Sequence, residues 1–169
     1  MKDSSGKQHP ANAFGYDSTL FTNIKPQGYK KYKRHPMTRK PKSLKTLVKD
    51  LDAIFSKYIR LSNANDTGYC TCCTCGKMYK WDDSSRINCG HYIGRQHKAH
   101  RWNERNCKPQ CARCNNWGQG EQVKFFKYLV AKYGAFYVDW LDASPKERKW
   151  SRFELETMIG HYKQLMEAL

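Results

Sequence analysis

Two cysteine-rich stretches decide the fold: residues 70–76 read Cys-Thr-Cys-Cys-Thr-Cys-Gly, and residues 107–115 read Cys-Lys-Pro-Gln-Cys-Ala-Arg-Cys-Asn. Cys72 and Cys75 are separated by two residues, and so are Cys111 and Cys114. This spacing lets two thiolates approach one tetrahedral Zn²⁺ from a single turn of chain, and the second pair completes the shell. Gly76 suits the tight turn, because the chain there often needs a positive φ. The pattern predicts a structural zinc site with four cysteine ligands.

The other four cysteines leave two alternatives open. Cys70 and Cys73 form an overlapping pair with the same spacing, and Cys89 and Cys107 have no assigned role. They are either small buried thiols or the ligands of a second zinc site. Because no signal-type apolar segment follows Met1, eight cysteines indicate metal binding rather than a disulfide scaffold.

Length and charge narrow the class of protein. A chain of 169 residues fits one domain of ordinary size. It holds no run of 18 apolar residues, so we expect neither a membrane span nor a secreted precursor. The net charge is +16, and the excess is concentrated in residues 1–49 and 86–113. Two concentrated basic regions favour a nucleic-acid partner over the alternative of a solvated basic surface.

The chain is predicted to form a basic, flexible or extended arm over residues 1–42 and a single domain over residues 43–169. Within the domain we expect a helix over 43–62, a zinc module over 70–120 and helices over 121–169. The local signals are a strand over 87–92, helices over 123–133 and 136–141, and a helical turn at Ser144-Pro145. Ser151 and Glu154 form a capping box for the last helix. The apolar stripe of that helix faces either the core or a second subunit.

Three polar residues between and after the cysteine pairs indicate chemistry. They are His91 at a predicted strand end, Asn106 five residues before Cys111, and Asn115 directly after Cys114. Neutral imidazole suits a general base near pH 7, and an amide oxygen is a ligand for a hard cation such as Mg²⁺. Taken singly, each could be an ordinary strand-end, turn or cap residue. Their joint order resembles the HNH, or ββα-metal, nuclease module in its endonuclease VII branch.

A closer resemblance is to the phage NinG/Rap recombination nucleases, which cut branched DNA such as Holliday junctions. The matching elements cover about residues 40–169; they are Lys40-Pro41-Lys42-Ser43, Cys72-Cys73-Thr74-Cys75-Gly76, Gly90-His91-Tyr92, the stretch Arg101-Trp102-Asn103-Glu104-Arg105-Asn106, Gln110-Cys111 and Cys114-Asn115. The resemblance implies an α+β fold in which a zinc-stapled ββα-metal module is flanked by helices. It also implies products with 5′-phosphate and 3′-hydroxyl ends.

The resemblance assigns roles to the polar residues. His91 would be the general base, and Asn106 would hold its ring in one tautomer through its side chain or its backbone carbonyl. Asn115 would bind a catalytic Mg²⁺, with Mn²⁺ as an alternative. The family carries Asp three residues before the histidine, where this chain has Asn88. Asn88 is therefore the tentative second ligand, with Glu104 and His97 as alternatives.

The partners follow from the same reasoning. We expect DNA, in particular branched or junction DNA, to bind a basic surface made of Arg95, Lys98, Arg101, Arg105, Lys108 and Arg113, together with Lys30, Lys31, Lys33 and Arg34 of the arm. His97 and His100 are expected to contact phosphate. Symmetric cleavage of a four-way junction needs two active sites, which predicts a homodimer, and a phage protein would act in the host cytoplasm. The alternatives are a zinc-ribbon DNA-binding protein without cleavage and an HNH nuclease without structure specificity.

Overall fold

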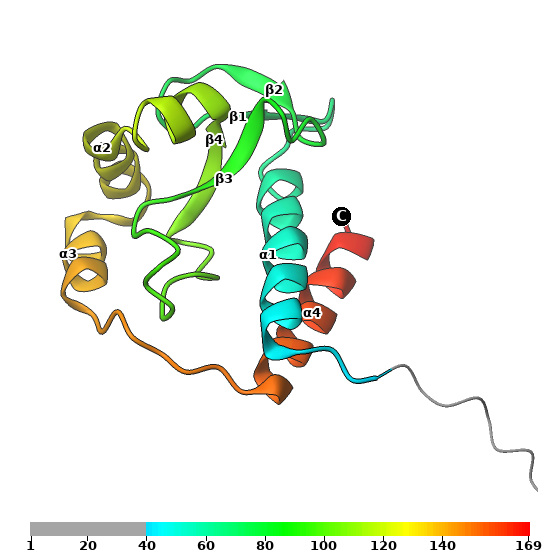
Figure 1. Cartoon of the computed structure of the whole chain (residues 1–169). Coiled ribbons are helices and arrows are strands. Elements are labelled where there is room, and N and C mark those ends of the chain that lie inside the picture. The colour runs from blue at the N-terminus through cyan, green and yellow to red at the C-terminus, as the bar shows by residue number, and fades with distance from the viewer. Residues whose placement is uncertain (1–39) are drawn as a thin grey trace, which may run out of the picture. The chain divides into compact units, whose positions relative to one another are not determined.

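The computed structural model describes residues 40–169 and shows a mixed α+β fold (Figure 1). Its elements are α1 (Leu44–Leu61), β1 (Tyr69–Thr71), β2 (Met78–Lys80), β3 (Ile87–His91), β4 (Cys107–Cys111), the π-helical turn η1 (Arg113–Trp117), α2 (Gln122–Tyr133), α3 (Ala135–Ala143) and α4 (Arg152–Glu167). The strands form two antiparallel pairs, β1–β2 and β3–β4. Residues 1–39 of the predicted arm, including Lys30, Lys31, Lys33 and Arg34, lie outside the described residues.

Helices α1 and α4 pack side by side, and both begin where the sequence predicts. The Ser43 hydroxyl caps α1 by accepting a hydrogen bond from the backbone N–H of Thr46. The capping box of Ser151 and Glu154 is present at the start of α4. The buried face of α1 repeats at helical spacing, and Phe55 meets Tyr162 of α4 edge to face, with 5.0 Å between ring centroids.

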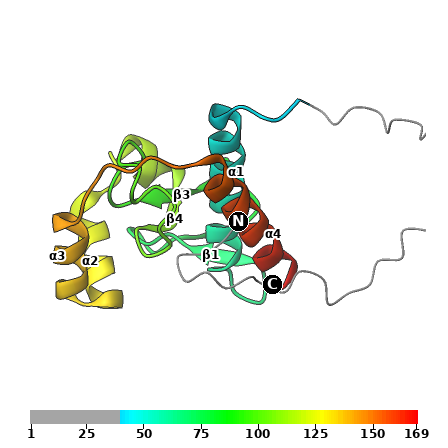
Figure 2. The ribbon, with the colours of Figure 1, turned by 90° about the horizontal axis from the view of Figure 1, so that it is seen from below.

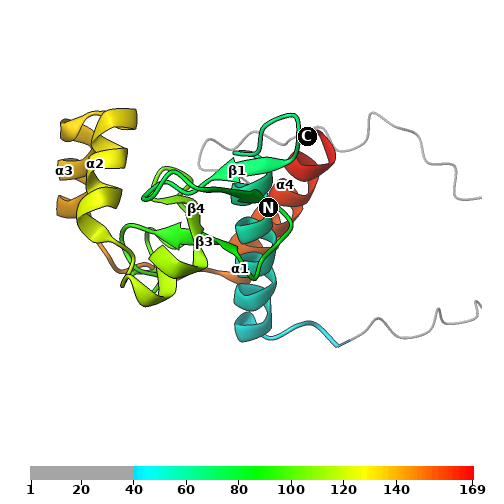
Figure 3. The ribbon, with the colours of Figure 1, turned by 90° about the horizontal axis from the view of Figure 1, so that it is seen from above.

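The β3–β4 hairpin lies between two pairs of helices. Helices α1 and α4 lie on one side of the hairpin, and α2 and α3 lie on the other (Figures 2 and 3). Its register pairs Ile87 with Cys111 at one end and His91 with Cys107 at the other. The hairpin therefore carries two residues of the predicted site, His91 and Cys111, at opposite ends.

Alternate residues of β3 face different helices. Cys89 packs against the core between α1 and α4, so His91, two residues further, shares that face. Asn88 and Gly90 then point to the side of η1 and α2. At Gly90 an added Cβ atom would collide with the side chain of Gln110, including its Cβ atom, so glycine is the residue that fits there.

The segment between α3 and α4 differs from the prediction. We expected a helical turn at Ser144-Pro145, but residues 145–151 contain no helix. The Ser144 hydroxyl donates to the carbonyl of Leu141 at 2.7 Å and lies 3.0 Å from Nε2 of His100. The Ser144 side chain therefore contacts residues that precede it and does not cap a helical turn. Residues 145–151 run as an extended segment to α4 (Figure 1).

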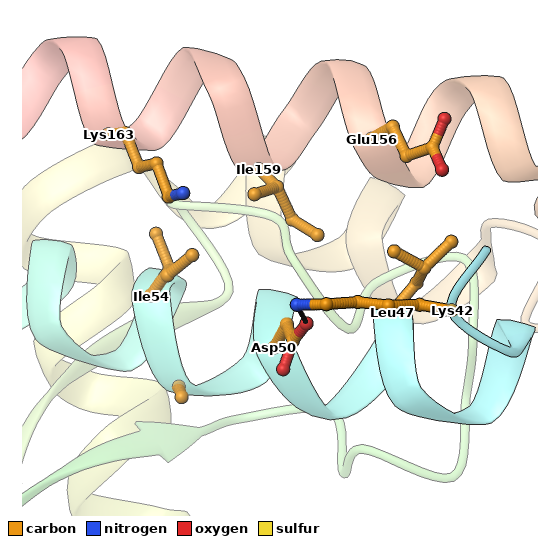
Figure 4. A pocket seen from close by; sticks show the side chains of 8 residues that line it. Lys42, Leu47, Asp50, Ile54, Glu156, Ile159 and Lys163 are labelled. Carbon is orange, nitrogen blue, oxygen red and sulfur yellow. Dashed lines mark hydrogen bonds and ion pairs between the residues drawn. The ribbon is translucent and has the colours of Figure 1, made fainter. Parts of the chain in front are cut away.

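A hollow of about 430 Å³ opens between α1 and α4. Ile54 and Ile159 line it, and the ammonium of Lys42 pairs with the carboxylate of Asp50 at its edge, with 2.6 Å between Nζ and Oδ2 (Figure 4). Among residues 40–169, no helix combines the length and apolar character needed to cross a membrane.

Candidate metal centre and histidine pocket

The four cysteines predicted to bind zinc lie together. The Sγ atoms of Cys72, Cys75, Cys111 and Cys114 are all within 4.8 Å of one another. Cys75 Sγ and Cys111 Sγ are 3.8 Å apart, which matches the edge of roughly 3.8 Å expected for a tetrahedron with Zn–S bonds of about 2.3 Å. The donor set fits a structural zinc ion, because four thiolates leave no open coordination position.

Backbone hydrogen bonds shape the four-cysteine site and favour the thiolate form of Cys72. The N–H of Cys111 donates to Sγ of Cys72 at 3.2 Å, and the N–H of Gly76 donates to the carbonyl of Cys72 at 3.0 Å. Gly76 has a φ of +72°, as its place in the turn required. Burial is the largest single effect on Cys72 and opposes its ionisation, but the hydrogen bonds from Cys111, Thr74 and Cys75 together outweigh it and lower the pKa of Cys72 to about 6.

The remaining cysteines do not form the second zinc site considered above. Cys70 lies beside the four-cysteine centre in a core with Ile87, whereas Cys73 packs against the core of α2 and α3. Cys89 and Cys107 are on the α1 side of the hairpin. The four thiols thus belong to three separate cores. Sequence spacing could not reveal this separation, because it depends on which face of each strand is buried.

His91 lies at the end of β3 with both ring nitrogens close to backbone oxygens. Nε2 is 3.0 Å from the carbonyl of Arg101, and Nδ1 is 3.2 Å from the carbonyl of Cys89. Burial lowers the pKa of His91 to about 4, although the Arg101 carbonyl favours the protonated ring. The ring is therefore neutral at pH 7. A cavity of about 30 Å³, lined in part by Asp52 and Arg95, lies beside it.

Asn106 acts on His91 indirectly. Its Nδ2 donates to the carbonyls of Ile93 and His100, both at 3.0 Å, and its Oδ1 accepts from the N–H of Ile93 at 2.7 Å. The loop of residues 92–106 is thereby closed, and this loop carries the Arg101 carbonyl. We expected Asn106 itself to hold the ring; the acceptor is instead the backbone of Arg101, a position that no side-chain pattern marks.

Asn115 is brought to Asn88 rather than to His91. Asn115 Nδ2 lies 3.5 Å from Asn88 Oδ1, so the two residues predicted to bind Mg²⁺ are neighbours. Gln110 pairs with Asn88 across the hairpin, and its Oε1 is buried without a hydrogen-bond partner among the described residues. Three amide side chains therefore lie on one side of the hairpin. Sequence reasoning missed Gln110, because only the strand register places it opposite Asn88.

Glu104 and His97, the two alternative Mg²⁺ ligands, make other contacts in the structure. Both carboxylate oxygens of Glu104 accept hydrogen bonds from tyrosines, Tyr58 at 3.4 Å and Tyr162 at 3.3 Å. Glu104 thus joins α1 to α4. His97 belongs to the turn that follows Gly94, where its N–H donates to the Gly94 carbonyl.

The predicted basic surface divides into exposed and engaged side chains. The exposed members are Arg95, Lys98, Arg105 and Arg113. Arg101 instead donates from Nε to Asp52 at 2.8 Å and pairs with the same carboxylate through its Nη2.

Lys108 and His100 depart from their predicted roles at the surface. Lys108 is only 4% exposed, because its ammonium donates to the carbonyl of Glu104 at 2.8 Å and lies over the ring of Tyr133. Burial lowers the pKa of Lys108 to about 8. His100, which we expected to contact phosphate, is buried against Ser144.

Comparison with known proteins gives a family match. A family model described as "Bacteriophage Lambda NinG protein" matches residues 22–169. Two curated relatives, each called "Protein ninG", come from Salmonella phage P22 and Escherichia phage lambda. Each is 27% identical over 99 residues, which are 58% of this chain and 47% of the relative. The chain thus spans about half the length of the curated relatives it matches. No solved structure matches.

Proposed function

Because the chain belongs to the NinG family of bacteriophage proteins, we propose that it is a metal-dependent endonuclease that cuts branched DNA such as four-way junctions. The module would be of the ββα-metal type, since a β-hairpin and a helical turn follow one another in the order β3, β4, η1. It would act as a homodimer, because symmetric cleavage of a junction requires two active sites. As a phage protein, it would act in the cytoplasm of the host.

The observation that carries the proposal is the fixed, neutral imidazole of His91. A neutral ring has one N–H; donated from Nε2 to the Arg101 carbonyl, it leaves the Nδ1 lone pair as the base. The cavity beside the ring has room for about one water molecule. Nδ1 takes a proton from the attacking water, the water oxygen bonds to phosphorus, and the bond to the 3′ oxygen breaks. The departing 3′ oxygen takes a proton from solvent water and becomes the 3′-hydroxyl.

The amide oxygens of Asn88, Asn115 and Gln110 fit a hard divalent cation, because such ions prefer oxygen ligands and Oε1 of Gln110 is buried with no hydrogen-bond partner within residues 40–169. When bound, Mg²⁺ or Mn²⁺ would neutralise charge on the scissile phosphate and on the departing oxygen. Asn88 and His91 are three residues apart on β3, which corresponds to roughly 10 Å of strand. The two side chains also point to opposite faces of the strand, and one phosphate group is much smaller than this distance. Asn88 and His91 therefore act on the same phosphodiester only if the hairpin or its loop rearranges when DNA binds.

A second candidate is a zinc-bearing DNA-binding protein that does not cleave. It is favoured by one observation, namely that both nitrogens of the His91 ring face backbone carbonyls, as they would in a purely structural histidine. The exposed arginines and lysines of residues 95–113 would serve this function equally well.

The deciding experiment is a gel assay of wild type and His91→Ala on four-way junction, flap and linear duplex DNA, with and without Mg²⁺. We expect the variant to lose at least about 100-fold in cleavage rate and to keep junction binding. His161→Ala is the matched control, because His161 is exposed on α4. If wild type cuts nothing with any divalent ion, the binding protein is the better description. Equal cutting of linear duplex would remove the preference for branched DNA.

A further inference from the structure

Cys89, His91 and Cys107 form a second group of metal-ligating side chains, apart from the four-cysteine centre. His91 is paired with Cys107 across the hairpin, and Cys89 precedes His91 by two residues on the same face of β3. One ligand atom from each lies within 4.8 Å of the other two. Two soft sulfur donors and one imidazole are a donor set for Zn²⁺ or a similar soft divalent ion, and not for Mg²⁺.

The orientation of the histidine suits a metal ligand. Nε2 lies 3.0 Å from the Arg101 carbonyl, as expected for an N–H that donates to it. A metal-binding histidine usually fixes its ring in this way, by donating its second nitrogen to a carbonyl or carboxylate. The lone pair of Nδ1 then faces the carbonyl oxygen of Cys89 at 3.2 Å, which is a repulsive contact in this tautomer. The ring therefore has to turn for Nδ1 to bind an ion held by the two sulfur atoms.

Space for a fourth ligand lies next to these side chains. Cys89 and His91 both line the cavity of about 30 Å³, together with Asp52, Ser56 and Arg95. This volume accommodates one water molecule. The Asp52 carboxylate is already bound by Arg101 and by the indole of Trp102, at 3.0 Å from its Nε1. Water is therefore the fourth ligand that fits.

We propose that Cys89, His91 and Cys107 bind one Zn²⁺ or chemically similar soft ion, completed by water, as a second metal site. Binding displaces the two thiol protons, so that two thiolates and one divalent ion form a neutral unit in a buried place. Occupation takes the Nδ1 lone pair of His91. On the proposed nuclease function, this second ion is an inhibitor, because the general base is no longer available.

The binding test uses the full chain carrying zinc in its four-cysteine centre, in the presence of a reductant, and adds Co²⁺ as the probe. We expect one further equivalent with the absorption of tetrahedral thiolate-bound cobalt. Replacing a residue that only hydrogen-bonds to a metal ligand costs about 10–100-fold in metal affinity. Cys107→Ser removes a ligand itself, so the affinity for the additional Co²⁺ should fall at least about 100-fold. Cys89→Ser should do the same and keeps the test valid if the buried Cys107 variant fails to fold.

Cys70→Ser is the matched control, because Cys70 is a buried thiol outside the group, and it should bind Co²⁺ as wild type does. The proposal is overturned if wild type takes up no second equivalent, or if Cys89→Ser and Cys107→Ser keep it unchanged.

The activity test is separate. Added Zn²⁺ should inhibit cleavage in Mg²⁺ by wild type and leave cleavage by Cys89→Ser unaffected. A protein that never cleaves contradicts the proposed function but leaves the binding result standing. A protein that binds the second ion and still cleaves at full rate contradicts the inhibitory role alone.

Discussion

The imidazole of His91 lies 3.0 Å, through its Nε2, from the carbonyl oxygen of Arg101, ten residues further along the chain. That carbonyl is held from two directions. The Arg101 side chain pairs with Asp52 of α1, and Asn106 closes the base of the loop by hydrogen bonds to Ile93 and His100. The orientation of the histidine is therefore a property of the whole loop rather than of one neighbouring side chain.

The first prediction concerns Asn106 as a positioning residue. Asn106→Ala leaves the N–H of Ile93 and two buried carbonyls without partners, which should lower the free energy of unfolding by about 3 kcal/mol. It should also reduce cleavage at least about tenfold at temperatures where the variant is folded, with junction affinity unchanged. Denaturant unfolding and cleavage kinetics measure the two effects. Asn103→Ala, in the same loop but partly exposed, is the control, and an equal loss there would contradict the positioning role.

The second prediction concerns zinc. Elemental analysis of wild type should find about one tightly bound zinc per chain if the second site is empty. Cys72→Ser should abolish this zinc. Because the binding free energy of a structural zinc is folding free energy, the variant should lose more than about 10 °C in Tm. Cys73→Ser changes the adjacent thiol, which lies outside the cluster, and should keep the zinc. Zinc that is lost from Cys73→Ser and kept by Cys72→Ser would mean that Cys70 and Cys73, the overlapping pair, are the ligands instead.

The sequence predicted the parts of this structure that depend on local signals. Helix α1 spans Leu44–Leu61 against an expected 43–62, and the capping box of Ser151 starts α4, because capping and helical spacing are properties of neighbouring residues. Strand β3 ends at His91, one residue before the expected end.

Long-range relationships were not predictable in the same way. Strand β4 was not identified as a strand, because Cys107–Cys111 is buried throughout and contains a proline, so it shows no alternation of polar and apolar residues. The grouping of Cys107 with His91, and of Gln110 with Asn88, follows from strand register. The spacing of cysteine pairs identified the four-cysteine centre, since each pair is local.

The third prediction concerns the amide cluster. Asn88→Asp should lower the Mg²⁺ concentration needed for half-maximal cleavage, because a carboxylate adds a negative charge beside the ion. Opposite unit charges about 4 Å apart attract by about 1 kcal/mol even in water, and the ion is divalent, so we expect a shift of at least about tenfold. Asn115→Ala should shift the requirement the other way.

The control for the amide cluster is Asn63→Asp, a change of the same kind at the end of α1, where Asn63 Nδ2 donates to the Ile59 carbonyl. If Asn63→Asp lowers the Mg²⁺ requirement as much as Asn88→Asp does, the effect is one of net charge. The ion would then not be held by the amides of the hairpin.

The last prediction separates two arginines that the sequence placed on one DNA-binding surface. Arg95 is exposed, so Arg95→Ala should weaken junction binding and reduce the slope of log affinity against log salt by about 0.9, the value of one phosphate contact on duplex DNA. Arg101 is engaged by Asp52, so Arg101→Ala should leave that slope unchanged and lower the free energy of unfolding by about 2 kcal/mol. Binding isotherms at several salt concentrations, together with denaturant unfolding, measure both quantities. If Arg101→Ala reduces the slope while Arg95→Ala does not, DNA displaces the Asp52 pair on binding, and the loop that orients His91 rearranges with it.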